Sequence, residues 1–215
     1  MIHNLINDQQ FIELEKEYKF LTRARGEDLA SLPVVVVDVE TTGLDYSQHE
    51  LIEIGALKLQ GKEIVGVFNS LIKPKSTITP EITRLTGIDN EMVNESPAAA
   101  EILAKFMDFA GTSVLVAHNV DFDIPFLKHH LQHLLKKELT NESLCTLKLS
   151  RYLLPNLVNH KLHTIASHFN IPVANRHRAM GDVELTYQVW LQFIEVLQGK
   201  GITRKVDLDS LISRL

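Results

Sequence analysis

Cysteine, basic residues and long apolar runs are scarce in this chain of 215 residues. The one cysteine, Cys145, cannot form a disulfide within the chain, which fits a reducing compartment. Lys and Arg number 22 against 27 Asp and Glu, a net charge of −5, so we do not expect a basic coat over the whole surface. No apolar run has the length of a membrane span, and the first residues lack the pattern of a signal peptide. We therefore expect a cytoplasmic protein with no membrane partner.

Apolar residues make up 45% of the chain, enough for a sizeable core, and their spacing predicts a mixed α/β sheet flanked by helices. We expect a helical N-terminal extension over 1–32, one domain over 33–198, and a short helical tail over 199–215. The expected elements are a helix within 8–24, strands at 51–59 and 63–72 joined at Gly61-Lys62, a short helix from Pro80, a helix from Pro97 to Gly111, a strand at 114–117, and helices at about 122–137, 146–153, 161–169 and 179–197.

Residues 34–43, Val-Val-Val-Val-Asp-Val-Glu-Thr-Thr-Gly, are the most informative stretch. Four consecutive valines predict a strand that is buried on both faces. Asp38 and Glu40 follow two residues apart, so their side chains leave the same face of that strand. Two unpaired carboxylates would repel each other and resist ionisation, and a divalent cation with oxygen ligands would relieve that repulsion.

Two further acids stand in similar surroundings. Asp123 follows a predicted strand in His-Asn-Val-Asp-Phe-Asp, and Asp182 begins the last long helix in His-Arg-Ala-Met-Gly-Asp. Ligands gather at the carboxyl ends of strands in open α/β sheets, so these acids are expected near Asp38 and Glu40. Four carboxylates there could hold two Mg²⁺ or Mn²⁺ ions, an arrangement that serves phosphoryl transfer. His177, five residues before Asp182, could accept a proton from the attacking water.

These three blocks resemble the motifs of the DEDDh (DnaQ-like) 3′–5′ exonuclease family, typified by the proofreading epsilon subunit of bacterial DNA polymerase III. Asp38 and Glu40 match the first motif, Asp123 the second, and His177 with Asp182 the third. The five-residue offset in the third block is that of the histidine subtype. The resemblance covers roughly residues 33–197.

The resemblance implies an RNase H-like fold with a five-stranded mixed sheet. It also implies two bound metal ions, His177 as the general base, and stepwise release of nucleoside 5′-monophosphates from a 3′ end. A histidine is common in the family where Thr86 stands. The residues that the resemblance places around the terminal nucleotide are Thr41, Thr42, Gly43, Leu44, Thr86, Ile88, Asn119 and Phe122.

Several alternatives stay open at this point. The leading hypothesis is an exonuclease acting on single-stranded or frayed DNA 3′ ends in proofreading or repair, with a possible polymerase partner. The first alternative is an exoribonuclease that trims short RNAs or RNA 3′ ends, and another is a non-catalytic subunit. The apolar stripe at 208–215 packs on its own domain or binds a partner. Asp121 is interpreted as a solvated acid at a helix start, and the histidines at 129, 130 and 133 as a solvated helix face rather than a zinc site.

Overall fold

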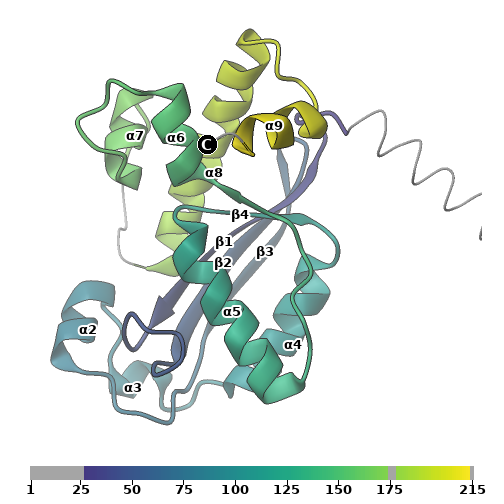
Figure 1. Cartoon of the computed structure of the whole chain (residues 1–215). Coiled ribbons are helices and arrows are strands. Elements are labelled where there is room, and N and C mark those ends of the chain that lie inside the picture. Colours follow the sequence, from purple (N-terminus) through teal and green to yellow (C-terminus); the bar gives the residue numbers. More distant parts are fainter. Residues whose placement is uncertain (1–26, 174–177, 214–215) are drawn as a thin grey trace, which may run out of the picture.

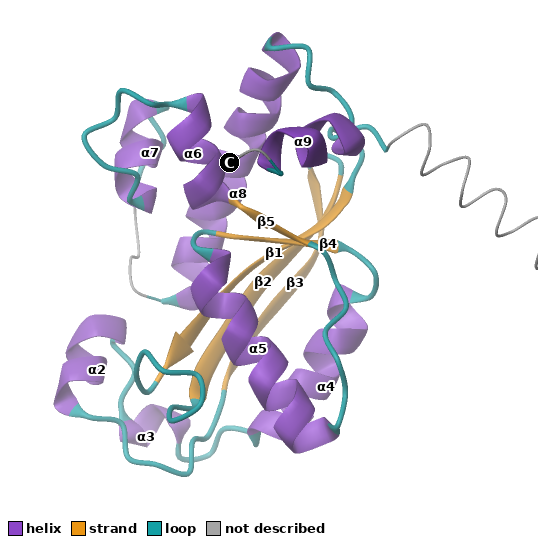
Figure 2. Ribbon diagram, viewed as in Figure 1, coloured by secondary structure: helices purple, strands orange, loops and turns teal. Residues whose placement is uncertain are grey.

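A five-stranded mixed sheet forms the centre of the computed structural model, which describes residues 27–173 and 178–213 (Figures 1 and 2). Its strand order is β3-β2-β1-β4-β5. β1 pairs antiparallel with β2 and parallel with β4, β2 pairs antiparallel with β3, and β4 parallel with β5. This arrangement confirms the predicted mixed sheet. The strands are β1 (Pro33–Thr41), β2 (Leu51–Gln60), β3 (Glu63–Leu71), β4 (Val114–Ala117) and β5 (Ser143–Cys145).

Helices cover both faces of the sheet. α4 and α5 belong to the core on one face, and α6, α7, α8 and α9 to the core on the other. Figure 1 shows α2 and α3 beyond the carboxyl end of β1. The helices are α2 (Pro80–Thr86), α3 (Asn90–Val93), α4 (Ala99–Ala110), α5 (Val120–Leu135), α6 (Thr146–Leu153), α7 (Leu162–His168), α8 (Ala179–Gly199) and α9 (Lys205–Ile212).

The valine strand contributes to both cores, as predicted. Val35 and Val37 pack in the core under α4 and α5, whereas Val34 and Val36 pack in the core under α8. All four side chains are buried. The strand therefore lies between two apolar layers, and this packing fixes the position of its carboxyl end, where Asp38 and Glu40 stand.

Most helix and strand boundaries lie close to the predicted ones, and the differences have local causes. α4 begins at Ala99 rather than near Pro97, because the Pro97 carbonyl accepts a hydrogen bond from the Lys73 amide and this segment stays extended. α5 ends at Leu135 because Lys136 adopts a left-handed backbone conformation with φ 55°. β5 and α3, with three and four residues, were not predicted as separate elements because they are too short to show a periodicity.

The two ends of the described chain pack together. Leu29, Leu32 and Leu208 are buried in the same core as Trp190, and the Leu29 amide donates to the Thr203 carbonyl at 2.8 Å. Leu208 of the apolar stripe thus packs on its own domain. The predicted helix within 8–24 lies outside the described residues.

None of the helices in the described ranges has the length and apolar character needed to cross a membrane.

Candidate active site

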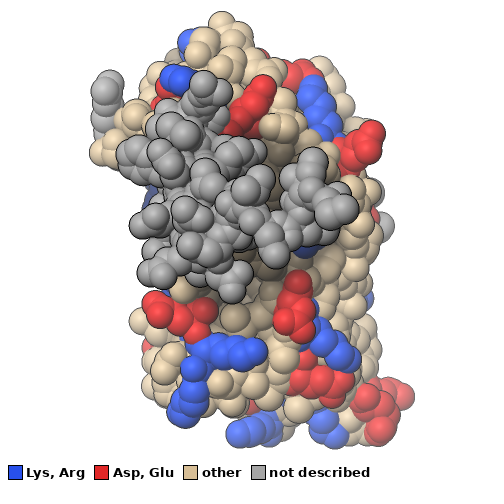
Figure 3. All heavy atoms as spheres, turned by 90° about the vertical axis from the view of Figure 1, so that its right-hand side faces the viewer, with Lys and Arg blue, Asp and Glu red and all other residues tan. Residues whose placement is uncertain are grey.

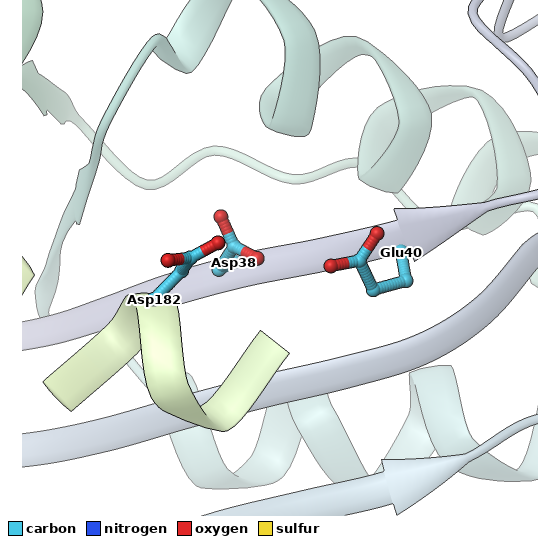
Figure 4. A group of neighbouring side chains, drawn as sticks. All are labelled: Asp38, Glu40 and Asp182. Atoms are coloured by element: carbon cyan, nitrogen blue, oxygen red, sulfur yellow. The ribbon is translucent and has the colours of Figure 1, made fainter. Parts of the chain in front are cut away.

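Three carboxylates meet where β1 ends and α8 begins. Asp38 and Glu40 come from β1 and Asp182 from the first turn of α8 (Figure 4). Each offers one oxygen atom, and these three atoms lie within 4.8 Å of one another. The predicted alternation along β1 is what places the first two acids on the face that α8 covers.

A glycine lets α8 approach the sheet at this point. Gly55 on β2 stands opposite Asp38 in the antiparallel register. A Cβ atom at Gly55 would lie 2.8 Å from the backbone carbon of Ala179, at the first residue of α8. Any larger side chain would push the helix away from the strand, and with it Asp182.

An ion pair between a buried acid and a partly exposed arginine ties the start of α8 to β2. Glu53 is 1% exposed, and its carboxylate accepts hydrogen bonds from Arg178 Nη2 at 2.7 Å and Arg178 Nε at 3.1 Å. The same carboxylate accepts from the Ala179 amide at 3.0 Å. The sequence analysis did not predict this ion pair. An acid inside the otherwise apolar run Leu-Ile-Glu-Ile-Gly-Ala-Leu could have indicated a buried carboxylate that needs a partner.

The carboxylates of Asp38 and Glu40 resist ionisation. Burial first, and then the neighbouring carboxylates, raise the pKa of Asp38 well above its ordinary value. Burial and the charges of Asp182 and Glu53 raise the pKa of Glu40 to about 8. Among the described residues, none donates a hydrogen bond to the carboxylate of Asp38 or Glu40. A cluster of hard oxygen donors whose charged forms are disfavoured fits a divalent cation.

Asp123, the fourth predicted acid, lies close to this group but does not belong to it. Its side chain is 2% exposed, and Oδ1 accepts a hydrogen bond from the Val39 amide at 3.2 Å. Burial raises the pKa of Asp123 to about 7. Its charge is the largest influence on the pKa of Asp38 after burial. The structure thus brings three of the four predicted acids together, while Asp123 is bonded to the Val39 amide of β1.

Of the two histidines nearest the site in sequence, the structure describes one. His177 lies outside the described residues. His118 Nδ1 lies 2.9 Å from Thr146 Oγ1, and burial lowers the pKa of His118 to about 4. His118 is therefore neutral at physiological pH and suited to hold its neighbours by hydrogen bonding.

The loop after β1 combines buried hydroxyls with an exposed apolar tip. The Thr41 hydroxyl donates to the Gly43 carbonyl at 2.6 Å, and the Thr42 hydroxyl accepts from the Glu50 amide at 2.9 Å. Leu44, by contrast, is 81% exposed. An apolar side chain held at the tip of a hydrogen-bonded loop has a free surface for a ligand.

The other predicted substrate residues differ in exposure. Thr86 and Ile88 are buried, and the Thr86 hydroxyl donates to the Ile82 carbonyl at 2.9 Å, so their predicted role has no exposed side-chain surface to support it. Asn119 is exposed and adopts φ 80°, a left-handed conformation that asparagine tolerates. Phe122 is half-buried and packs against Phe126 at 5.0 Å between ring centroids.

Neighbouring groups that the sequence analysis set aside stay apart from the site. Asp121 forms an exposed ion pair with Lys148 at 2.8 Å. His129 and His133 stack with ring centroids 4.1 Å apart on α5, and they are not part of the carboxylate group. The predicted solvated face is wrong for His130, which is buried with Nδ1 3.0 Å from the Phe126 carbonyl.

Comparisons with known proteins agree with this geometry. The family model described as exonuclease matches residues 35–190. The chain belongs to the exonuclease family. This match confirms the predicted class of enzyme and the resemblance on which the prediction rested.

Two relatives of this chain are named as DNA polymerase III proteins. It is 36% identical over 163 residues to the DNA polymerase III subunit epsilon of Aquifex aeolicus, covering 76% of this chain and 81% of the relative. It is 42% identical over 189 residues to a PolC-type DNA polymerase III of Caldanaerobacter subterraneus, covering 87% of this chain but 13% of that relative. The chain thus spans a small part of the length of this PolC-type relative.

Solved structures show the same fold. Exonuclease X in complex with a 5′ overhanging duplex DNA superposes with a TM-score of 0.61 at 25% identity, covering 80% of this chain and 95% of that one. E. coli Exonuclease I in complex with a dA16 oligonucleotide gives a TM-score of 0.64 at 18% identity over 79% and 42% of the two chains. These likenesses confirm the RNase H-like architecture of the exonuclease.

Proposed function

We propose that this protein is a divalent-metal-dependent 3′–5′ exonuclease that removes nucleotides from DNA 3′ ends in proofreading or repair. The observation that carries the proposal is the carboxylate group of Asp38, Glu40 and Asp182, within a chain that belongs to the exonuclease family. We take residues 33–198 as the exonuclease domain, which agrees with the matched range 35–190. The cytoplasmic location stays a prediction.

Asp38, Glu40, Asp123 and Asp182 are the residues that would hold two Mg²⁺ or Mn²⁺ ions. Three of them already offer oxygen atoms to a common point. When bound, such ions supply a hydroxide-like nucleophile at neutral pH and stabilise the charge on the leaving oxygen. The hydrogen bond from the Val39 amide holds one oxygen of Asp123, and its other oxygen would bind metal. His177 is the proposed general base, and it would remove the proton of the attacking water.

The 3′-terminal nucleotide is proposed to lie over the loop after β1. The exposed Leu44 would stack against its base, which suits any base because stacking tolerates sequence. Thr41, Thr42 and Gly43 would present backbone groups to its sugar. Asn119 and Phe122 lie at the start of α5, beside the acids, and would close the opposite side of the nucleotide.

DNA is favoured as the substrate by the names of the relatives. The epsilon and PolC-type relatives are parts of DNA polymerase III, and the Exonuclease X structure contains duplex DNA. These names also favour a polymerase partner, which co-purification at stoichiometric yield would test. The alternative is an exoribonuclease, which differs in its tolerance of the 2′-hydroxyl.

The test uses strands of one sequence, as DNA and as RNA, labelled at the 3′ or the 5′ end. With Mg²⁺, we expect nucleoside 5′-monophosphate to appear first from the 3′ label of the DNA strand, and EDTA to stop its release. Faster release from RNA would favour the alternative. Release that starts at the 5′ end, or that continues in EDTA, would contradict the proposal.

A further inference from the structure

A cavity of about 630 Å³ connects the acids to a basic wall. Asp38 and Asp182 line one end of it. Arg151 at the end of α6 and His160, Lys161 and His163 on and before α7 line the other, and we call these four residues the basic wall. Groups of opposite sign therefore face the same space from two different segments of the chain.

Two members of the basic wall carry unused positive charge. Arg151 and Lys161 are exposed, and neither side chain forms an ion pair or hydrogen bond with any described residue. Lys148, three residues before Arg151, is by contrast paired with Asp121 at 2.8 Å.

Arg151 and Lys161 are also not the counterions of Asp38 or Glu40. The cation whose charge lowers the pKa of Glu40 is Arg178, which is bonded to Glu53. The charges that act on Asp38 all come from other carboxylates. The positive charges of Arg151 and Lys161 are therefore available to a ligand that reaches both ends of the cavity.

The wall is held in place from behind. Ser150 Oγ lies 3.0 Å from His160 Nδ1, and the Asn159 side-chain oxygen accepts hydrogen bonds from the Lys161 amide at 3.1 Å and the Thr164 hydroxyl at 2.7 Å. These contacts fix the backbone around Lys161, whose side chain is exposed and lines the cavity. A fixed backbone with free cationic heads suits a ligand that carries regularly spaced negative charge.

We propose that Arg151 and Lys161 bind the phosphates that precede the terminal nucleotide of a single DNA strand. The inference rests on the proposed function, since it requires the scissile phosphate to lie at the acids. The strand then continues along the cavity in its 5′ direction, and its next phosphates meet the basic wall. The overall charge of −5 gives no such attraction, so the preceding phosphates depend on local positive charge such as that of Arg151 and Lys161.

The test compares Arg151→Gln/Lys161→Gln with a matched control, Lys105→Gln/Lys137→Gln. The control removes the same charge from exposed positions on α4 and just after α5, on the opposite face of the sheet. Two substrates are used: a DNA oligonucleotide, and the p-nitrophenyl ester of thymidine 5′-monophosphate, which has no preceding phosphate. Thermal unfolding of each variant verifies that it is folded.

We expect the ratio of kcat/KM on the oligonucleotide to kcat/KM on the ester to fall at least about tenfold in the wall variant, mainly through KM. The salt dependence of oligonucleotide binding should become shallower, by about 0.7 in logarithmic slope for each lost contact with a single strand. The control variant should keep the wild-type ratio and slope.

An unchanged ratio, or an equal fall in the control, would overturn the inference. So would a weaker inhibition by thymidine 5′-monophosphate in the wall variant, because that would assign the wall to the released nucleotide. A loss seen with an RNA strand but not with DNA would overturn the assignment to DNA. If the wild-type protein hydrolyses neither substrate, the proposed function itself fails, which is a different result.

Discussion

The two faces of β1 share the same two-residue period but carry different kinds of side chain. Toward α4 and α5, Val35, Val37 and Val39 are all buried in an apolar core. Toward α8, Val34 and Val36 begin in the same way, and then Asp38 and Glu40 replace the expected apolar residues. One face stabilises the fold, while the other holds carboxylates whose pKa values are raised by burial first and then by neighbouring carboxylates. The carboxylates of the site are therefore carried by a strand whose other face is fixed in an apolar core.

A second contrast concerns one face of the outer surface. On the face shown in Figure 3, acidic and basic side chains lie side by side below the undescribed atoms. The carboxylates at the end of β1 differ from that part of the surface in being of one sign.

The largest expected effect comes from removing a charge on the acidic face. Asp182→Asn keeps the shape of the side chain but removes one of the three oxygens with negative charge at the common point. We expect nucleotide release to fall about 10³-fold or more, since metal-based stabilisation is worth several kcal/mol. Labelled-strand assays measure the rate, and circular dichroism verifies the fold. A rate within about tenfold of wild type would contradict the assignment of the catalytic site to the acidic face of β1.

The second prediction compares alanine substitutions at two glycines, one beside α8 and one beside α4. Gly55→Ala places a Cβ atom 2.8 Å from the backbone of α8, whereas Gly66→Ala on β3 meets the Phe109 ring of α4 at 3.0 Å. Both changes should destabilise the fold by about 1–3 kcal/mol, a typical range for overpacking. Only Gly55→Ala should also lower activity, because it displaces the helix that carries Asp182. Rates per folded molecule, measured below the unfolding transition, decide; an equal loss in both variants would contradict the account.

The pH dependence of stability tests whether the folded metal-free protein disfavours the charged form of Glu40. The pKa of Glu40 is raised from 4.5 to about 8, so between these values the folded metal-free protein holds a proton that the unfolded chain releases. Its stabilising effect is complete below about pH 4.5 and is lost as the pH rises through 8. Glu40→Gln should flatten this loss and raise the metal-free Tm at pH 8, by about 2–4 °C for each kcal/mol relieved.

Thermal scans in EDTA at several pH values measure this change. Added Mg²⁺ should raise the Tm of the wild-type protein more than that of Glu40→Gln, because it relieves the repulsion only where the charge is present. A Glu40→Gln variant that is less stable than wild type at pH 8 in EDTA would refute the repulsion.

The smallest effect on activity is expected from the apolar face. Val37→Ala leaves a small cavity in the core under α4 and α5 and should cost about 2 kcal/mol of unfolding free energy. Nucleotide release per folded molecule should stay close to wild type. Chemical denaturation measures the first quantity and the labelled-strand assay the second. A large loss of activity without a loss of stability would contradict the claim that this face of β1 serves the fold rather than the reaction.

Much of this molecule was predictable from local pattern. The four valines announced a strand buried on both faces, and the spacing of Asp38 and Glu40 predicted their shared side. The hairpin at Gly61, where φ is 64°, follows from turn chemistry. These features depend on residues near one another in the chain, and sequence reasoning is strongest there.

What could not be predicted depends on pairing across the chain. The ion pair between Glu53 and Arg178 joins residues 125 positions apart, and the role of Gly55 appears only when α8 is packed against it. The separate place of Asp123 is likewise set by a hydrogen bond to the Val39 amide. Periodicity carries no information about which distant residues meet.

The central claim, that the acidic face of β1 binds divalent cations, is tested most directly by calorimetric titration of Mn²⁺ into the metal-free protein. The account predicts saturable binding to wild type, weakened at least about 100-fold in Asp38→Asn, since even supporting residues of metal sites contribute 10–100-fold. Val37→Ala, on the opposite face of the same strand, should bind Mn²⁺ as wild type does. Equal Mn²⁺ affinity in wild type and Asp38→Asn, or no binding to wild type, would contradict it.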